Sequence, residues 1–145
     1  MTAPGPAGTR VTAEPAASAE EIAALLRVDF ASFAQACFAE LHPQTPFALG
    51  WHIELVAAKL MAVRRREIRR LIINLPPRHA KSLLASVAFP AWCLGHEPSK
   101  QILCVSYAQD LADKHARDCR RILASDWYQA LCDTAVADAA GGAGI

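Results

Sequence analysis

The sequence lacks the features that mark secreted, disulfide-stapled and membrane-spanning proteins. Its five cysteines include no C-x-x-C pair, and no apolar run is long enough to cross a bilayer. The first residues also show no charged segment followed by a long apolar stretch. We therefore expect a reduced cytoplasmic protein with no membrane partner.

An excess of charge of one sign is also missing, because 15 basic and 14 acidic residues leave a net charge of +1. The distribution is more informative than the total. One stretch whose single acid is Glu67 holds eight basic residues: Lys59, Arg64, Arg65, Arg66, Arg69, Arg70, Arg78 and Lys81. This basic patch could face ATP or the phosphates of duplex DNA, the latter through the five arginines from Arg64 to Arg70, or it could be a solvated helix end that complements the helix macrodipole.

The composition divides the chain into three parts. Residues 1–17 are rich in alanine, proline and glycine without periodicity, which predicts a flexible arm. Residues 133–145 are a low-complexity Ala/Gly tail, which we interpret as the premature end of a longer reading frame. Residues 18–132 carry the apolar periodicity of a folded domain.

Two amphipathic helices are predicted in the first half of this domain. Ser18 and Glu21 form a capping box, and the apolar residues after it recur at helical spacing in one long helix ending near Leu41. A second helix is expected over residues 51–67. Four apolar residues at helical spacing form its predicted buried face: Ile53, Val56, Leu60 and Val63.

Two near-continuous apolar segments, residues 70–75 and 101–107, are typical of buried parallel strands. An apolar helical stretch interrupted by Pro90 lies between them, and a further helix is expected where Ser106 and Gln109 form a second capping box. This order predicts an α/β fold in which two parallel strands are joined by a right-handed crossover. The turn after the first strand would then lie at the carboxyl edge of the sheet.

That turn ends in Lys81-Ser82 and carries the clearest chemistry in the chain. In a P-loop, backbone N–H groups surround the phosphates, a lysine extends along them and a hydroxyl binds Mg²⁺. The regular pattern G-x-x-x-x-G-K-[ST] is altered here, because Leu75 and Ala80 occupy the glycine positions. The alternative is an ordinary turn whose lysine and serine only cap a helix.

Two prolines, Pro76 and Pro77, stiffen the turn and supply no N–H groups. The phosphate cradle would therefore be built from the next six residues: Arg78, His79, Ala80, Lys81, Ser82 and Leu83. We expect Ala80 to keep a negative φ, because left-handed geometry costs a non-glycine residue about 1–2 kcal/mol.

Residues 51–128 resemble the N-terminal ATPase portion of bacteriophage terminase large subunits. The resemblance is carried by WHIE (51–54), RRLIIN (69–74), LPPRHAKS (75–82), FPAW (89–92) and SYAQD (106–110). It implies a partial P-loop NTPase fold that binds ATP and Mg²⁺, within a machine that packages phage DNA in a bacterial host cell. The family's other partners are the capsid portal and the small terminase subunit.

The same resemblance assigns roles to particular residues. It places Lys81 on the phosphates, Ser82 on Mg²⁺ and Arg78 near the γ-phosphate. It also places residues 47–52 beside the adenine, where Trp51 could stack on the base and His52 could donate a hydrogen bond. Ordinary core packing would explain Trp51 equally well.

The chain lacks the catalytic half of such a site. Hydrolysis needs acids at the end of another apolar strand, and no strand ending in an Asp-Glu pair follows the turn. Asp138 is the nearest imitation, and no nuclease domain is present. We therefore expect nucleotide binding without turnover from a truncated terminase segment.

Other interpretations stay open. The chain could be a non-enzymatic remnant or an interaction module, or a fragment of another P-loop ATPase such as a helicase-like protein. A zinc site is a further alternative, which would use the i,i+3 and i,i+4 pairs formed by Cys93, His96, His115 and Cys119.

Overall fold

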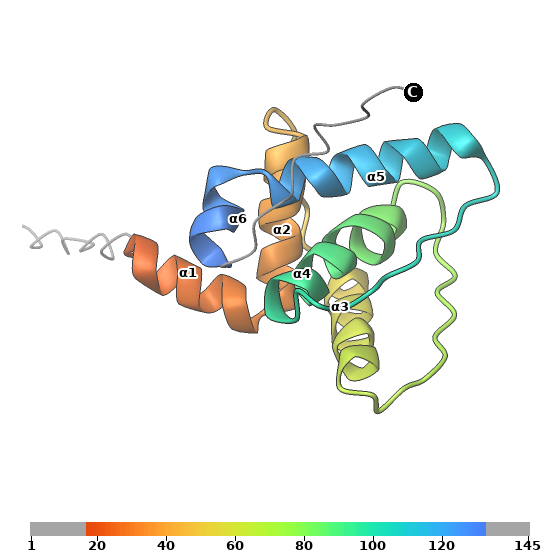
Figure 1. The fold of residues 1–145 in the computed structure, drawn as a ribbon, viewed down its shortest axis with the longest axis horizontal. Coiled ribbons are helices and arrows are strands. Elements are labelled where there is room, and N and C mark those ends of the chain that lie inside the picture. Colours follow the sequence, from red (N-terminus) through yellow and green to blue (C-terminus); the bar gives the residue numbers. More distant parts are fainter. Residues whose placement is uncertain (1–16, 133–145) are drawn as a thin grey trace, which may run out of the picture.

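The computed structural model describes residues 17–132, and all of the regular structure in that range is helical (Figure 1). The elements are α1 (Ala19–Val28), α2 (Phe30–Leu41), α3 (Trp51–Arg64), the π-helical segment η1 (Leu83–Ala88), α4 (Phe89–His96), α5 (Gln109–Leu123) and α6 (Asp126–Leu131). No single helix in residues 17–132 is long and apolar enough to cross a membrane. The bent pair α1 and α2 together would pass that test by length and composition alone.

The predicted α/β fold is wrong, because residues 17–132 contain no β-strand and no sheet. Residues 70–75 do alternate as a half-buried strand would: Leu71, Ile73 and Leu75 pack against the core, whereas Ile72 is 86% exposed. A sheet additionally requires a neighbouring strand that satisfies the backbone N–H and C=O groups. Neither apolar segment finds such a neighbour among the described residues.

The expected helix from Ser18 to Leu41 is two helices, and the chain bends by 114° between them. The capping box is confirmed, because Ser18 N–H donates to a Glu21 carboxylate oxygen at 2.7 Å and Glu21 N–H donates to Ser18 Oγ at 3.2 Å. The break lies at Asp29, whose carboxylate accepts a 2.8 Å hydrogen bond from Ser32 N–H and so caps α2. The apolar periodicity continues across this break, which explains why the pattern alone predicts one helix.

Helix α3 begins at Trp51, as predicted, and ends at Arg64 instead of Glu67. Its end is a Schellman motif, in which Arg66 N–H donates to Val63 O and Glu67 N–H donates to Ala62 O, both at 2.9 Å. Arg66 provides the left-handed residue of this motif with a φ of 63°. Of the four residues predicted on the buried face, only Val63 is not buried.

The helix after the turn changes its hydrogen-bonding register before Pro90. Phe89 N–H donates to Leu84 O, five residues earlier, and α4 then starts with Pro90 near its first position. Proline has no N–H to continue an α-helical ladder, which accounts for this change of register. The chain nevertheless stays helical from Leu83 to His96, so the predicted interruption is seen only as a change of hydrogen-bonding register. The predicted Ser106–Gln109 capping box is wrong, because α5 has Ala108 at its N-cap and no side-chain cap.

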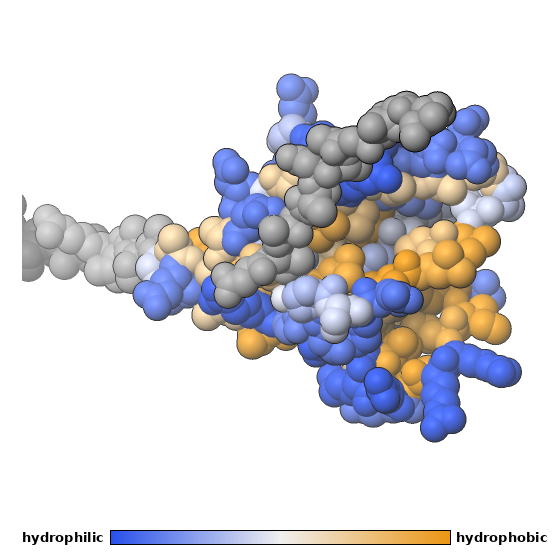
Figure 2. Space-filling model, viewed as in Figure 1, coloured by the Kyte–Doolittle hydropathy of each residue, from blue (hydrophilic) through white to orange (hydrophobic). Residues whose placement is uncertain are grey.

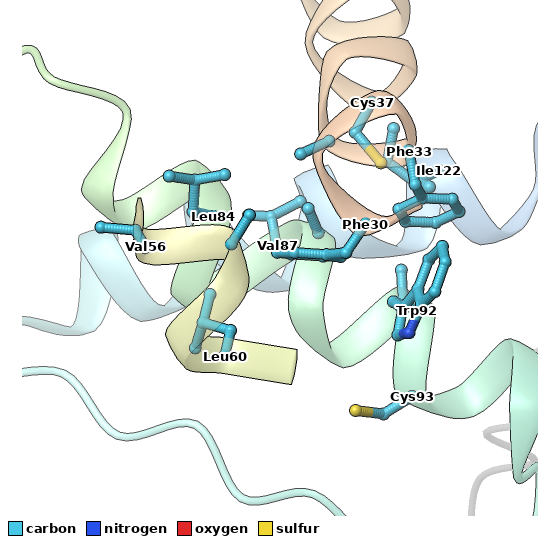
Figure 3. Packing of buried hydrophobic residues seen from close by; sticks show 14 of the residues in the cluster. Phe30, Phe33, Cys37, Val56, Leu60, Leu84, Val87, Trp92, Cys93 and Ile122 are labelled. Carbon is cyan, nitrogen blue, oxygen red and sulfur yellow. The ribbon is translucent and has the colours of Figure 1, made fainter. Parts of the chain in front are cut away.

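The core lies where α2, α3, η1, α4 and α5 meet (Figure 3). Phe30 and Phe33 of α2 pack edge-on against the Trp92 ring of α4, with centroids 5.6 and 5.1 Å apart. Leu84 and Val87 of η1 are also buried in this cluster. This packing anchors the helix that follows the turn, and so fixes the turn in space.

Candidate phosphate-binding turn and adjoining aromatic hollow

The turn before η1 has left-handed backbone geometry at Arg78, with φ of 67°, and at Ala80, with φ of 55°. The expectation of a negative φ at Ala80 is therefore wrong. The alanine holds the conformation that glycine supplies at little cost, so this residue carries about 1–2 kcal/mol of backbone strain. A left-handed residue followed by helical residues directs successive N–H groups toward one side, which is the geometry of an anion-binding nest.

Three N–H groups at this helix start lie before the first helical hydrogen bond. That bond runs from Leu84 N–H to Ala80 O at 2.9 Å, so the N–H groups of Lys81, Ser82 and Leu83 have no acceptor in the preceding turn. The positive end of the helix dipole adds to them, which makes this terminus attractive to an anion.

The side chains of the turn surround a hollow of about 440 Å³ lined by residues 75–83. Lys81 and Ser82 are both exposed on its wall. The hollow therefore combines backbone donors, a mobile cation and a hydroxyl group. This combination can hold a phosphate chain and the metal ion bound to it.

A second hollow, of about 450 Å³, shares Arg78, His79, Ala80 and Leu83 with the first. Its remaining walls come from the end of α2, the connection that follows and the start of α3: Phe38, His42, Pro46, Phe47, Ala48, His52 and Ile53. The Phe38 ring lies 4.9 Å from the rings of both His42 and Phe47. The phosphate-binding turn thus continues into a hollow with aromatic walls.

The structure separates the two residues predicted to contact a base. His52 lines the second hollow, and its ring lies edge-on to His79 at a centroid distance of 5.4 Å. Trp51 is 75% exposed and is not part of the wall. A Cβ at Gly50 would lie 2.9 Å from His52 Cε1, so glycine at the N-cap of α3 leaves room for this histidine ring.

His79 is held by the turn itself. Its Nδ1 lies 2.9 Å from Pro77 O. Because a carbonyl oxygen can only accept, Nδ1 must carry the proton of this bond. This tautomer leaves Nε2 as an acceptor, which suits an amino group on a ligand.

Phe38 and His42 are wall residues that the sequence did not indicate, whereas Phe47 belongs to the segment of residues 47–52 that the resemblance places beside the adenine. Phe38 belongs to the apolar pattern of α2, and His42 and Phe47 lie in the segment that ends this helix. Their common position depends on how α2 packs against η1, which local patterns do not encode. A weak indication was available, since two aromatic residues and a histidine flank one helix break.

The basic cluster is partly neutralised. Arg65 Nε lies 2.6 Å from a Glu67 carboxylate oxygen, and this hydrogen bond lowers the pKa of Glu67. Arg64 lies 4.0 Å from Glu97, whose pKa is lowered chiefly by a hydrogen bond from Lys100. The remaining three arginines of the set, Arg66, Arg69 and Arg70, are exposed and form no salt bridge within residues 17–132.

The proposed zinc ligands do not form a site. No group of three or more histidine, cysteine or acidic residues in residues 17–132 is arranged to hold a metal ion. The ring nitrogens of His96 instead lie 2.9 Å from Trp92 O and Arg27 O. Asp138, considered above as a catalytic acid, lies outside the described residues.

Comparison with known proteins adds no assignment, because no family model, curated protein or solved structure matches the chain.

Strain at Ala80 leads to the first prediction. Ala80→Gly should leave the folded protein equally stable or raise its free energy of unfolding by up to about 1 kcal/mol, because relief of left-handed strain offsets the added freedom of the unfolded chain. Ala58→Gly, at an exposed site inside α3, should lower the same free energy by about 1 kcal/mol. Urea denaturation followed by circular dichroism measures both. An equal decrease in the free energy of unfolding in the two variants would contradict the strained geometry at Ala80.

Proposed function

We propose that this chain binds ATP with Mg²⁺ at the turn of residues 75–83, as a segment of a terminase large-subunit ATPase. One observation carries the proposal: two hollows adjoin each other at the turn. The first has unpaired helix N–H groups, Lys81 and Ser82 on its wall, and it continues into the second, which has aromatic walls. This pair of adjoining hollows suits a nucleotide, because the phosphates require hydrogen-bond donors and cations whereas the base requires flat apolar surfaces.

Each part of the nucleotide has a matching group in this proposal. The N–H groups of Lys81, Ser82 and Leu83 receive the phosphate oxygens, Lys81 Nζ adds a charge-assisted bond, and Ser82 Oγ binds Mg²⁺. Arg78 lines both hollows within the turn, and in this proposal it would contact the terminal phosphate. The base would lie against Phe38 or Phe47, with His52 and His79 at its edge.

Hydrolysis is not part of this proposal. Neither hollow has an aspartate or glutamate among its lining residues. Among residues 17–132, therefore, no acid lines these hollows to orient the attacking water or to help hold the metal ion. The expected activity is binding, and the ancestral role is phage DNA packaging. The capsid portal and the small terminase subunit would be partners of the complete motor in the bacterial cytoplasm.

A titration with a fluorescent ATP analogue tests this proposal on the full chain. Binding should saturate with Mg²⁺ present and weaken strongly with EDTA, because the metal neutralises part of the phosphate charge and engages Ser82. A parallel phosphate-release assay should stay at background. Binding that is unchanged by EDTA would favour an interaction module, and steady phosphate release would require an acid that the two hollows lack.

We also propose duplex DNA as a weak, sequence-independent partner. Three exposed arginines without salt bridges support this proposal: Arg66, Arg69 and Arg70. They lie close together in the sequence, just before the extended segment that leads to the turn.

Replacing Arg66, Arg69 and Arg70 together by alanine should weaken DNA binding and flatten its salt dependence. Each lost phosphate contact lowers the slope of log K against log salt by about 0.9, so three lost contacts lower it by about 2.7. The matched control is the double variant Arg64→Ala/Arg65→Ala, because both side chains already face carboxylates. Fluorescence anisotropy at several salt concentrations measures the slopes. Equal slopes in the triple variant and the wild type would assign these arginines to helix-end solvation.

A further inference from the structure

Residues 101–107 run extended along the surface between α4 and α5 (Figure 1). Figure 2 shows apolar atoms gathered on the side of the molecule along which this segment runs. A hollow of about 240 Å³ lies between the segment and the helices η1, α4 and α5. Four residues of the segment line this hollow: Ile102, Cys104, Val105 and Ser106. The segment therefore forms the outer wall of a space whose inner wall is the helical core.

Two thiols border this hollow, Cys104 from the segment and Cys119 from α5. The position of Cys119 follows from the pattern of α5. The residues of α5 that line the hollow include four at spacings of three and four: Ala112, His115, Ala116 and Cys119. Residues at this spacing lie on one face of a helix, so the face of α5 that carries Cys119 is the one turned toward the segment.

The electrostatics agree with this placement. The pKa of Cys119 is raised to about 11, first by burial and second by the negative charge of Cys104. Such an effect of one sulfur on the other requires proximity, because the interaction between charges weakens with distance. Cys104 is exposed, so solutes can reach it, whereas Cys119 is only partly accessible. The hollow thus brings together an accessible thiol and a sheltered one.

The segment is also free to adjust its position. Within residues 17–132, no N–H or C=O group of residues 101–107 takes part in a backbone–backbone hydrogen bond. A disulfide requires Cα atoms about 4.4–6.8 Å apart and suitably directed side chains. Cys104 can move across the hollow to meet this requirement without breaking a backbone hydrogen bond.

We propose that Cys104 and Cys119 form a reversible intramolecular disulfide when the chain meets a low-molecular-weight disulfide such as oxidised glutathione. The two residues are then a modification site, and the cross-link fastens residues 101–107 to α5 and narrows the hollow. In a reducing compartment the pair stays as two thiols, and it closes only when the supply of oxidised disulfide rises.

The reaction consists of two thiol–disulfide exchanges. In the first, the Cys104 thiolate attacks one sulfur of oxidised glutathione, which forms a mixed disulfide and releases one glutathione thiolate. In the second, the Cys119 sulfur attacks the Cys104 sulfur, and the bond between Cys104 and glutathione breaks. The second glutathione thiolate leaves and takes up the proton that Cys119 loses. Overall, the two cysteines lose two electrons and two protons, and oxidised glutathione becomes two reduced molecules.

The other thiols near this pair are less suited to the reaction. Cys37 of α2 is 0% exposed in the core, where burial raises its pKa, so oxidised glutathione cannot reach it. Cys93 of α4 is buried and lines a different hollow, together with Arg64 and Lys100. Cys119 is the one other thiol on the wall of the hollow that Cys104 lines. The structure therefore favours this pairing over the alternatives.

The experiment incubates the full chain in glutathione buffers with a rising proportion of the oxidised form. Free thiols are then blocked with N-ethylmaleimide, and the intact mass is measured. Trypsin places the two cysteines in separate peptides, residues 101–114 and residues 118–120. The wild type should lose two hydrogen atoms, and these two peptides should be recovered as one disulfide-linked species. The cross-linked chain should also unfold at a higher urea concentration than the reduced chain, because the bond restricts the unfolded state.

Three variants separate the two exchange steps. Cys119→Ala should stop the reaction after the first step, so its Cys104 should gain the mass of one glutathionyl group. In Cys104→Ser, the peptide of residues 118–120 should be recovered without a link to another peptide. Cys93→Ala is the matched control, because it removes a thiol from a different hollow, and it should form the same cross-link as the wild type.

Several results would overturn the proposal. Equal accumulation of the glutathione adduct in the wild type and in Cys119→Ala would show that the two sulfur atoms do not meet. Linkage of Cys104 or Cys119 to a different cysteine, or to a second chain, would assign the pairing wrongly. Neither cysteine lines the two hollows of the proposed ATP site, so these results and those of the ATP titration are independent.

Discussion

Lys81→Ala is expected to weaken ATP binding by about 10- to 100-fold while leaving the fold unchanged. Lys81 is the one lysine among the residues that line the two hollows, and its side chain is exposed, so its removal empties no part of the core. A hydrogen bond to a charged group contributes about 1.5–3 kcal/mol, which corresponds to this range of affinity. The fluorescent ATP titration described above measures the change.

Lys59→Ala is the matched control for this variant. Lys59 is also exposed, and it lies on α3 away from both hollows, so its loss removes the same charge from the protein without touching the turn. If ATP bound only by general attraction to positive side chains, both variants would bind ATP equally less tightly than the wild type. Equal affinity of Lys81→Ala and the wild type would remove the basis for a phosphate site at this turn.

The fold shows how far local patterns reach. Two features that depend on residues close in sequence were predictable: the capping box of Ser18 and Glu21, and the start of α3 at Trp51. Pro90 also marked the place where the helix changes its hydrogen-bonding register, although the helix does not end there. The absence of a sheet was not predictable, because an alternating apolar pattern indicates extended backbone but contains no information on whether a neighbouring strand exists. The bend at Asp29 was missed because both helices contribute apolar residues to one core.

In the candidate site, too, the features set by local sequence were predictable and those set by long-range packing were not. Lys81 and Ser82 belong to a short motif, so they could be found without any structure. The left-handed φ of Ala80 could not be predicted from the sequence, because glycine is the usual residue in that geometry and this position holds alanine. The aromatic hollow depends on long-range packing, because Phe38 meets the turn only through the contact of α2 with η1.

Helix α2 offers two phenylalanines with opposite expected effects on stability and on binding. Phe33 is 1% exposed, and its ring centroid lies 5.1 Å from Trp92, 5.6 Å from Trp127 and 6.2 Å from Tyr128. Phe33→Ala should lower the free energy of unfolding by about 3–5 kcal/mol, because it leaves a cavity that three helices cannot close. For a small domain whose total stability is about 5–15 kcal/mol, this loss removes much of the folded-state margin.

Phe38→Ala should instead weaken ATP binding more than it lowers the stability of the fold. Phe38 is only half-buried, so its removal should cost less stability than that of Phe33, and denaturation in urea measures both losses. Its ring lines the aromatic hollow, where base stacking on a side chain contributes about 1–3 kcal/mol, so ATP affinity should fall by roughly tenfold or more. The test compares ATP with inorganic triphosphate, which has no base and should bind Phe38→Ala as it binds the wild type. If ATP affinity were retained in Phe38→Ala, the base would have to lie outside this hollow, and the phosphate site at Lys81 would stand without it.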